Sequence, residues 1–284
     1  MSKGIHWLGI GSDNLIVVKT NEFGIMMVED LEEKIIQSLK NDKKPFFVNA
    51  TAGTTVLGAF DDFNKVADVC EKYNIWFHVD ACLGGSAIFS RKHKALLNGV
   101  ERSQSMSWNP HKTLGAPMQC SLFLIKQKGL LNECNSANAD YLFQQDKFYD
   151  VAFDTGNKSV QCGRKVDAFK FWLMYKKRGI SGFEMLMNNA FDCASYLTQE
   201  TKKRSNFRLV LEKYQYTNVC FWYIPKYMMN RNDVETSQWW ECIYKITSFI
   251  KEKMILDGKL MCAYTPLLHK NIGNFFRMVK LKTD

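Results

Sequence analysis

The sequence predicts an α/β protein in which a large domain with a mainly parallel sheet precedes a smaller α+β domain. Three observations predict this class. Apolar residues make up 46% of the chain and aromatic residues 13%, values typical of a globular protein. In the first half, short apolar runs alternate with amphipathic stretches, as in βαβ units. After about residue 130 the alternation stops, so we expect a boundary near residue 172, with domains 1–172 and 173–284.

The elements of the first half follow from the spacing of apolar residues. Each expected strand is a short apolar run ending in small or polar residues, and each expected helix has apolar residues three or four positions apart. The expected strands are 15–19, 45–50, 75–80, 105–108 and 120–125, and the expected helices are 28–41, 62–74 and a short one around 92–101. Because one βαβ unit separates strands 75–80 and 105–108, both should end at the same edge of the sheet.

The second half begins with residues 132–160, which hold few apolar runs. A loop of this length inside a compact domain is usually functional. The expected helices after it are 164–178, 183–204 and 238–257, and the expected strands are 207–212, 218–224, 260–265 and 274–281. These elements predict the smaller α+β domain.

Charge and cysteine usage narrow the classes of function. The net charge is +9, but the lysines occur in small groups and no nucleic-acid-binding motif accompanies them. The nine cysteines form no C-x-x-C pair, and the five histidines do not cluster with them at zinc spacing. No run of 18 apolar residues occurs, and the first residues lack a secretory segment. We expect a reduced, cytoplasmic protein that binds neither a metal, a nucleic acid nor a membrane.

Two short segments carry the chemistry. In HVDACLGG, a buried strand delivers Asp80 to its carboxyl end, where ligands bind in open α/β sheets. In SWNPHKTLG, Pro110 should break any helix and make Asn109 extended, so that His111 and Lys112 project from a turn. Taken alone, Asp80 is equally well interpreted as a turn or N-cap residue, and Lys112 as a solvated lysine.

The pairing of this acid with this amine indicates pyridoxal 5'-phosphate (PLP). A PLP enzyme needs a lysine that bonds to the cofactor and a carboxylate beside the pyridine nitrogen. The ring withdraws electrons only while that nitrogen is protonated, and a carboxylate within about 4–6 Å shifts the pKa of a partner by roughly 1–3 units toward the charged form. We therefore expect Asp80 to keep the ring cationic and Lys112 to hold it.

A third segment, NATAGTTVLGAFD, follows strand 45–50 at the same edge. Gly53 permits a tight turn and close approach of the backbone. Thr54 and Thr55 offer hydroxyls that could bond the ring oxygen of the cofactor. Taken alone, the segment is equally well interpreted as an ordinary strand-to-loop turn.

Together, the GTT turn, HVDA and NPHK resemble the group II PLP-dependent decarboxylases, which include glutamate, cysteine-sulfinate, aspartate and aromatic amino-acid decarboxylases. The motifs are spaced as in that family, NPHK after such an HVDA is highly specific, and the resemblance covers essentially the whole chain. It implies the fold of aspartate aminotransferase (type I), a homodimer, and removal of the α-carboxylate through a Schiff-base and quinonoid mechanism.

The resemblance also implies a role for each motif residue. The implied cofactor-binding residues lie in three turns and are Lys112, Asp80, Thr54, Thr55, Cys82, Asn109 and His111. Lys112 would be the Schiff-base lysine, and Asp80 would pair with the pyridine nitrogen. Thr55 would lie near the ring, while Asn109 and His111 would contact the phosphate.

Two further segments bear on substrate and partner. Residues 141–172 look most like the cysteine-sulfinate and acidic amino-acid decarboxylases, in which this segment is a mobile loop over the partner subunit's site. The resemblance therefore implies that loop 141–160 reaches the partner and that Tyr141 donates the proton that replaces carbon dioxide. NFFRMV resembles the segment whose arginine binds the substrate α-carboxylate, which is Arg277 here. Without the resemblance, Arg277 would be assigned to a surface ion pair.

The chain departs from the family pattern at three places. Cys82 stands where a small residue is usual, and Leu83 where an aromatic one is usual. Family members carry a ring-stacking histidine just before the stretch that resembles residues 1–9, and a helix after the final strand, so we expect an N-terminally truncated fragment that also lacks its last helix.

Three hypotheses about function follow. The first is a carboxy-lyase that acts on cysteine sulfinate, aspartate or glutamate. The second is a catalytically inactive truncated relative that acts only as a dimerisation partner. The third, weaker one is another PLP reaction, such as transamination. Among the substrates, one methylene is worth only about 1–3 kcal/mol of discrimination, so the sequence leaves the choice open.

Overall fold

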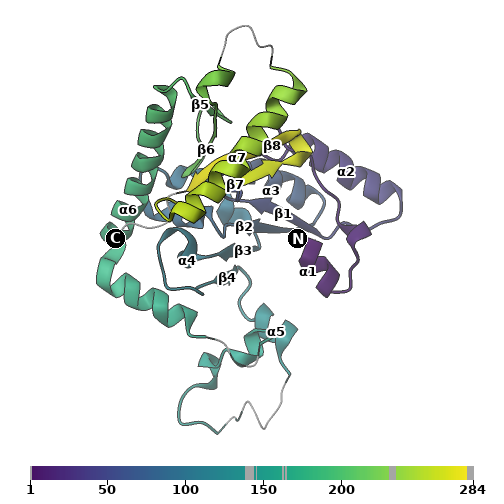
Figure 1. Cartoon of the computed structure of the whole chain (residues 1–284). Helices are drawn as coiled ribbons and strands as arrows, with labels where there is room; N and C mark the ends of the chain where they lie inside the picture. The colour runs from purple at the N-terminus through teal and green to yellow at the C-terminus, as the bar shows by residue number, and fades with distance from the viewer. Residues whose placement is uncertain are drawn as a thin grey trace.

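Two four-stranded sheets organise the computed structural model of this chain (Figure 1). The structure describes residues 2–137, 144, 146–161, 163, 165–229 and 235–279. Its α-helices are α1 (Ser2–Trp7), α2 (Val28–Lys40), α3 (Phe63–Lys72), α4 (Pro110–Thr113), α5 (Leu130–Asn135), α6 (Asp167–Lys202) and α7 (Ser237–Asp257). Short 3-10 turns lie at Ser12–Asn14, Gly84–Phe89, Lys94–Leu97, Val100–Arg102, Val151–Phe153, Gly156–Lys158, Lys226–Met228 and Leu268–Lys270.

The first sheet is mainly parallel, as the sequence predicts. Its order is β1 (Phe47–Thr51), β2 (Trp76–Asp80), β3 (Ser105–Trp108) and β4 (Leu122–Ile125). The first three strands run parallel, and β4 pairs with β3 in the antiparallel direction. The amphipathic helices α2 and α3 pack on one face because their apolar stripes meet the inward side chains of β1 and β2.

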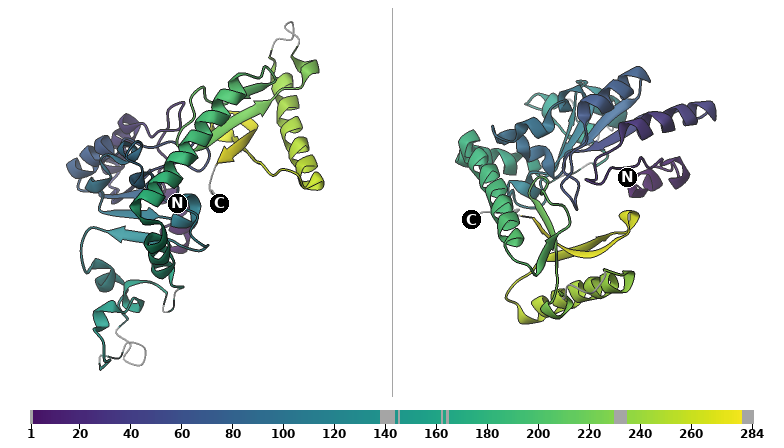
Figure 2. Two further views of the ribbon diagram at one scale, coloured as in Figure 1. Left: turned by 90° about the vertical axis from the view of Figure 1, so that its left-hand side faces the viewer. Right: turned by 90° about the horizontal axis from the view of Figure 1, so that it is seen from above.

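The second sheet is antiparallel and lies between two helices. Its order is β5 (Phe207–Leu209), β6 (Asn218–Tyr223), β8 (Ile272–Val279) and β7 (Ala263–Leu267). In β6, Val219 and Phe221 face α6, whereas Cys220 and Trp222 face α7, as strand alternation requires. The right-hand view of Figure 2 shows α6 and α7 on opposite sides of this sheet. The predicted α/β class with a smaller C-terminal α+β unit is confirmed.

Helix α6 joins the two halves of the chain. Phe183 and Met187 belong to the core beneath the first sheet, and Ala194 packs on the second sheet. Its backbone leaves helical geometry at Gly179, which corresponds to the gap between the expected helices 164–178 and 183–204. This helix runs through residue 172, so no loop marks a boundary there. The domain boundary near that residue stays a prediction.

Two expectations about local structure were wrong. Residues 15–19 form no strand, and Val17 is exposed, with its carbonyl oxygen accepting a hydrogen bond from Lys34. Pro110 does not prevent a helix but begins α4, since at the first helical position its missing N–H has no intrahelical acceptor in any case. Asn109 before it is extended, as expected.

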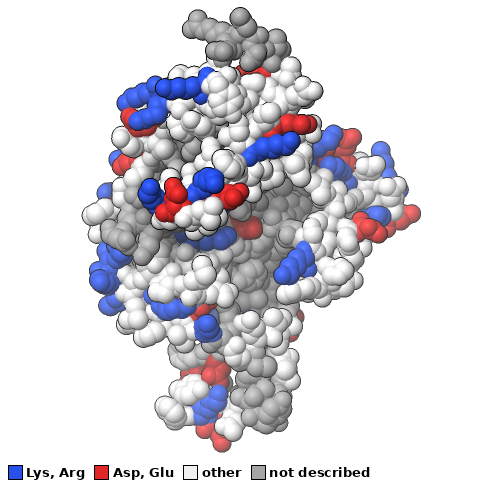
Figure 3. Space-filling view, in the orientation of Figure 1, with Lys and Arg blue, Asp and Glu red and all other residues white. Residues whose placement is uncertain are grey.

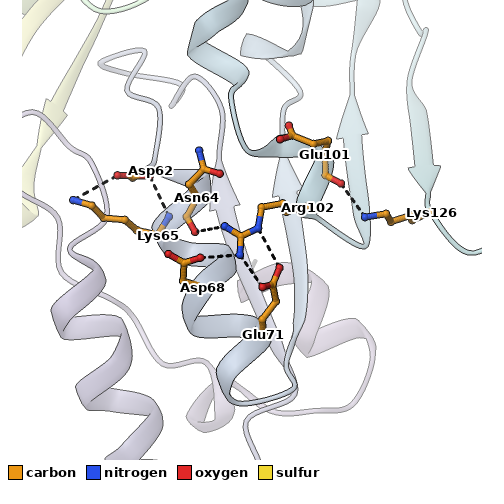
Figure 4. A network of polar contacts seen from close by, with 8 residues as sticks. All are labelled: Asp62, Asn64, Lys65, Asp68, Glu71, Glu101, Arg102 and Lys126. Carbon is orange, nitrogen blue, oxygen red and sulfur yellow. Dashed lines mark hydrogen bonds and ion pairs between the residues drawn. The ribbon is translucent and has the colours of Figure 1, made fainter.

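Charged residues fasten the surface turns to the helices. Arg102 lies in the 3-10 turn Val100–Arg102, and its partners lie on α3. Its guanidinium contacts the carboxylates of Asp68 and Glu71 at 2.7 Å each and the carbonyl oxygen of Asn64 at 3.1 Å (Figure 4). These contacts raise the pKa of Arg102 above its ordinary value. On the face shown in Figure 3, basic and acidic side chains lie in small mixed groups, not in one stripe.

The segment from α5 to the start of α6 projects away from the two sheets (Figures 1 and 2). It contains the described part of the predicted 132–160 loop, in which α5 packs near the 3-10 turn Gly156–Lys158. Among the described residues, no helix is both long and apolar enough to cross a membrane.

Candidate active site

Asp80 and Lys112 lie at the same edge of the first sheet, as the sequence predicts. Asp80 is the last residue of β2 and is paired with Ser107 in the adjacent parallel strand β3. Helix α4 begins two residues after β3 ends, and it carries Lys112. The fold therefore brings an acid and an amine, 32 residues apart in sequence, to neighbouring strand ends.

The Asp80 carboxylate is held from one side. Its Oδ1 atom accepts a hydrogen bond from the backbone N–H of Cys82 at 3.0 Å and a longer one from the hydroxyl of Ser107 at 3.4 Å. Both bonds go to Oδ1, so within the part of the chain that the structure describes no backbone N–H or hydroxyl donates to Oδ2, while the thiol of Cys82 interacts with the same carboxylate. The half-buried carboxylate thus keeps one oxygen available to a ligand.

A second set of contacts ties α4 to the turn after β2. The hydroxyl of Thr113 donates to the carbonyl oxygen of Leu83 at 3.3 Å, and the buried hydroxyl of Tyr216 donates to the same oxygen at 3.2 Å. Lys112 precedes Thr113 and is half-buried, and its ammonium has no ion-pair partner in the described ranges. These contacts hold the helix that carries Lys112 against the turn that follows Asp80.

The pKa of the Cys82 thiol depends on the charges of both Asp80 and Lys112. Burial is the main reason that the pKa of its thiol rises to about 11. The nearby carboxylate of Asp80 raises this pKa further, and the positive charge of Lys112 lowers it. The thiol lies close enough to both groups to interact with them, and it stays protonated at neutral pH.

The turn after β1 completes this edge. Gly53 has φ +80°, and a Cβ there would lie 2.9 Å from the backbone nitrogen of Gly84, so only glycine lets the two turns approach this closely. The hydroxyl of Thr54 accepts the backbone N–H of Ala59 at 3.0 Å and so supports the turn. The side chain of Thr55 is exposed.

Arg277 reaches this turn from the second sheet. It lies on β8, and its guanidinium donates to the carbonyl oxygen of Thr55. Its Nε atom is buried and has no hydrogen-bond partner among the described residues. The arginine predicted to bind a carboxylate therefore stands beside the turn predicted to bind the cofactor.

The remaining predicted residues have mixed placements. The Nδ1 atom of His111 lies 2.6 Å from the carbonyl oxygen and 3.2 Å from the nitrogen of Cys120, so that atom is engaged within its own loop. Asn109 does not use its side chain to cap α4. Tyr141 lies outside the described residues, so its predicted role stays a prediction.

Sequence reasoning missed the residues that support the acid and the amine. His78 and Ser105 connect through Ser107 to Asp80, while Thr113 and Tyr216 hold Leu83. Alternation along β2 could have placed His78 on the face of Asp80. Nothing local in the sequence indicates Tyr216, because it comes from the other half of the chain.

An acid and an amine at the carboxyl edge of a mostly parallel sheet are the arrangement expected of an enzyme of the PLP-dependent class. Residues 6–224 match the family described as the pyridoxal-dependent decarboxylase conserved domain. Because this match covers more than half of the chain, the chain belongs to that family.

Named relatives agree with this assignment. The chain is 51% identical over 280 residues to the acidic amino acid decarboxylase GADL1 of Mus musculus, covering 98% of the chain and 50% of the relative. It is 48% identical over 280 residues to the cysteine sulfinic acid decarboxylase of Homo sapiens, covering 98% of the chain and 56% of the relative. The crystal structure of mouse CSAD in apo form superposes with a TM-score of 0.92 at 45% identity, covering 99% of this chain and 57% of that one. The chain thus spans about half the length of the curated relatives it matches.

Proposed function

We propose that the polypeptide containing this chain is a PLP-dependent carboxy-lyase that removes the α-carboxylate of an acidic amino acid. The observation that carries the proposal is the meeting of Asp80 and Lys112 at one sheet edge, each with a free functional atom. The names of the relatives, an acidic amino acid decarboxylase and a cysteine sulfinic acid decarboxylase, support cysteine sulfinate, aspartate or glutamate as the substrate class.

The donor set fits PLP. Oδ2 of Asp80 is an unoccupied acceptor, the ammonium of Lys112 is half-buried without an ion pair in the described ranges, and Gly53 leaves the backbone open at this edge. Asp80 and Lys112 would hold the ring, Thr54, Thr55 and Cys82 would lie beside it, and Asn109 and His111 would contact the phosphate. When bound, the cofactor supplies an electron sink that no side chain provides.

Each residue of the chain has a defined task in this proposal. The Asp80 carboxylate would keep a proton on the pyridine nitrogen, since an opposite charge nearby favours the cationic form. The Lys112 amine would bond to the cofactor and give way to the substrate amine. The guanidinium of Arg277 would orient the substrate by binding its α-carboxylate.

The remaining parts of the proposal concern the partner. We infer a homodimer in which loop 141–160 reaches the partner's site and Tyr141 donates a proton to the substrate carbon. The described part of the loop projects away from the sheets, a position that suits contact with a second chain (Figure 1). The alternative, an inactive relative that only dimerises, is also compatible with this projection.

The first prediction tests the lysine. Adding PLP to the purified chain should produce a visible absorbance band, because the Lys112 amine bonds to the cofactor aldehyde. Lys112→Ala should abolish the band, whereas Lys126→Ala, at an exposed lysine bonded to the carbonyl oxygen of Glu101, should keep it. An unchanged band in Lys112→Ala would contradict the proposed role.

Product analysis tests the reaction and the alternative. Cysteine sulfinate, aspartate and glutamate labelled at the α-carboxylate would be offered to the PLP-loaded protein, and release of labelled carbon dioxide would be measured. Release from one of them, lost in Lys112→Ala, is expected. Sedimentation that shows dimers, together with no absorbance band and no carbon dioxide, would favour the dimerisation partner instead.

A further inference from the structure

A line of hydrogen-bonding groups runs along one face of β2 and β3 and ends at Asp80. Trp76, His78 and Asp80 share this face of β2 because they are two residues apart. The indole N–H of Trp76 donates to the hydroxyl of Ser105 at 2.9 Å, and that hydroxyl lies 2.8 Å from Nδ1 of His78. On the far side of the ring, Nε2 of His78 lies 3.4 Å from the hydroxyl of Ser107, which itself contacts Oδ1 of Asp80 at 3.4 Å.

The Asp80 end of this line determines the direction of the bonds at Ser107. An indole N–H can only donate, and an ionised carboxylate can only accept. Each serine hydroxyl has a single proton, so Ser107 must accept from His78 if it donates to Asp80. The proton on Nε2 of His78 is fixed by this end of the line. Ser105 accepts from Trp76 with one lone pair and keeps its own proton, so in a neutral ring it donates to the bare Nδ1 of His78.

The surroundings of His78 agree with a neutral ring. The imidazole is stacked between Phe47 and Phe123, with ring centroids 5.8 and 5.9 Å away. Burial lowers the pKa of His78 below its ordinary value, and the carboxylate of Asp80 opposes this only in part. Both flanking groups are aromatic, so they add no charge beside the imidazole.

We propose that His78 is a positioning residue: by donating from Nε2 to Ser107, it directs the hydroxyl of Ser107 onto Oδ1 of Asp80 and so leaves Oδ2 aimed at the cofactor nitrogen. The last clause rests on the proposed function. The direction of the bonds at Ser107 does not rest on it, because the carboxylate of Asp80 sets that direction without a ligand. We expect the long contacts at Ser107 to shorten when a ligand engages the carboxylate, as catalytic hydrogen bonds of ligand-free sites commonly do.

The direction of the bonds is tested by nitrogen NMR on the full chain. With 15N-labelled histidine, the two ring nitrogens of His78 are identified by the signals that disappear in His78→Phe, which keeps an aromatic ring between Phe47 and Phe123. At pH 7 we expect a protonated Nε2 and an unprotonated Nδ1. A proton on Nδ1 alone would overturn the proposal, and protons on both nitrogens would contradict the neutral ring. This measurement needs no cofactor.

The effect on the site is tested by PLP binding, followed by absorbance. Ser107→Ala should weaken binding about ten-fold, the size expected for one hydrogen bond to a charged group. Ser86→Ala is the control, since Ser86 likewise loses a hydroxyl that makes a hydrogen bond, from the indole N–H of Trp108 at 3.0 Å, but it does not contact His78 or Asp80. Equal weakening in the two variants would contradict a specific role for Ser107.

A double-mutant cycle isolates the action of His78. If His78 acts through Ser107, His78→Phe should weaken PLP binding several-fold in the wild-type chain and have little further effect in the Ser107→Ala chain. Independent, additive losses would overturn the proposal. If the wild-type chain does not bind PLP, the proposed function and the cofactor clause both fail, and the NMR result alone then decides the direction of the bonds.

Discussion

Asp61 is a buried acid that joins the N-terminal segment to the first sheet. Its two carboxylate oxygens accept the backbone N–H groups of Met26 and Thr51, both at 2.7 Å. The residue is only 8% exposed, and burial raises the pKa of its carboxyl above 3.8 despite these two bonds. The charged form is therefore bound by good donors but poorly solvated.

This balance gives a prediction at the residue scale. The folded chain holds the Asp61 proton more tightly than the unfolded chain does, so the contribution of Asp61 to stability falls as pH rises from about 3.8 through its raised pKa. Asp61→Asn cannot titrate, and its single acceptor oxygen leaves one N–H unpaired, at a cost of about 1–3 kcal/mol. Urea unfolding of both chains should show the advantage of the wild type shrinking as pH rises. Asp13→Asn, at an exposed aspartate, serves as the control, and an advantage that grew with pH would contradict the assignment.

At the scale of single elements, α4 is too short to hold its own position. It has four residues, and its own helical hydrogen bonds are correspondingly few. The bond from Thr113 to the carbonyl oxygen of Leu83 anchors the helix to the turn after β2. The position of Lys112 therefore depends on a contact made by the next residue.

Replacing Thr113 by valine tests this anchor. Valine keeps the shape of the side chain but removes the hydroxyl, and the Leu83 carbonyl keeps its bond from Tyr216. We expect the free energy of unfolding to fall by about 1 kcal/mol. The free energy of PLP binding should fall by more than the free energy of unfolding does, because Lys112 would be less well placed. Thermal unfolding and absorbance titration measure the two effects, and Thr198→Val, at a buried helical threonine in α6, is the control. Unchanged PLP affinity would show that α4 is held by other contacts.

At the scale of the whole molecule, the two halves meet at the turn after β1. The amide of Asn218 donates to the carbonyl oxygens of Thr55 and Val56, and Arg277 donates to Thr55. Gly58 has φ +76°, and a Cβ there would lie 2.4 Å from the carbonyl oxygen of Gln215. The candidate site thus depends on close backbone contact between the halves.

Gly58→Ala should separate these halves. Strain at positive φ and the collision with Gln215 together predict a loss of about 2–5 kcal/mol of stability. Gly129→Ala is the matched control, because Gly129 has φ +89° but open space around its Cβ position, so it carries the strain without the collision. Chemical denaturation of the two variants measures the difference, and equal losses would contradict the importance of the contact.

Most of the elements could be predicted from local pattern. The amphipathic spacing that forms α2 and α3 and the apolar runs that form β1 and β2 are properties of neighbouring residues. The segment 15–19 has the same apolar character but no strand because its backbone finds no ladder partner in the described structure. The prediction failed there because pairing is not a local property.

The sequence by itself determined the alternation of strands and helices, and the two motifs that bring Asp80 and Lys112 to one edge, because parallel strands joined by right-handed crossovers end on the same side. Only the tertiary structure decided which oxygen of Asp80 is free, that His78 connects to it through Ser107, and that Tyr216 supports the turn beside it. Those contacts depend on strand register and on how two distant halves of the chain pack. Neither can be predicted from the spacing of residues along one segment.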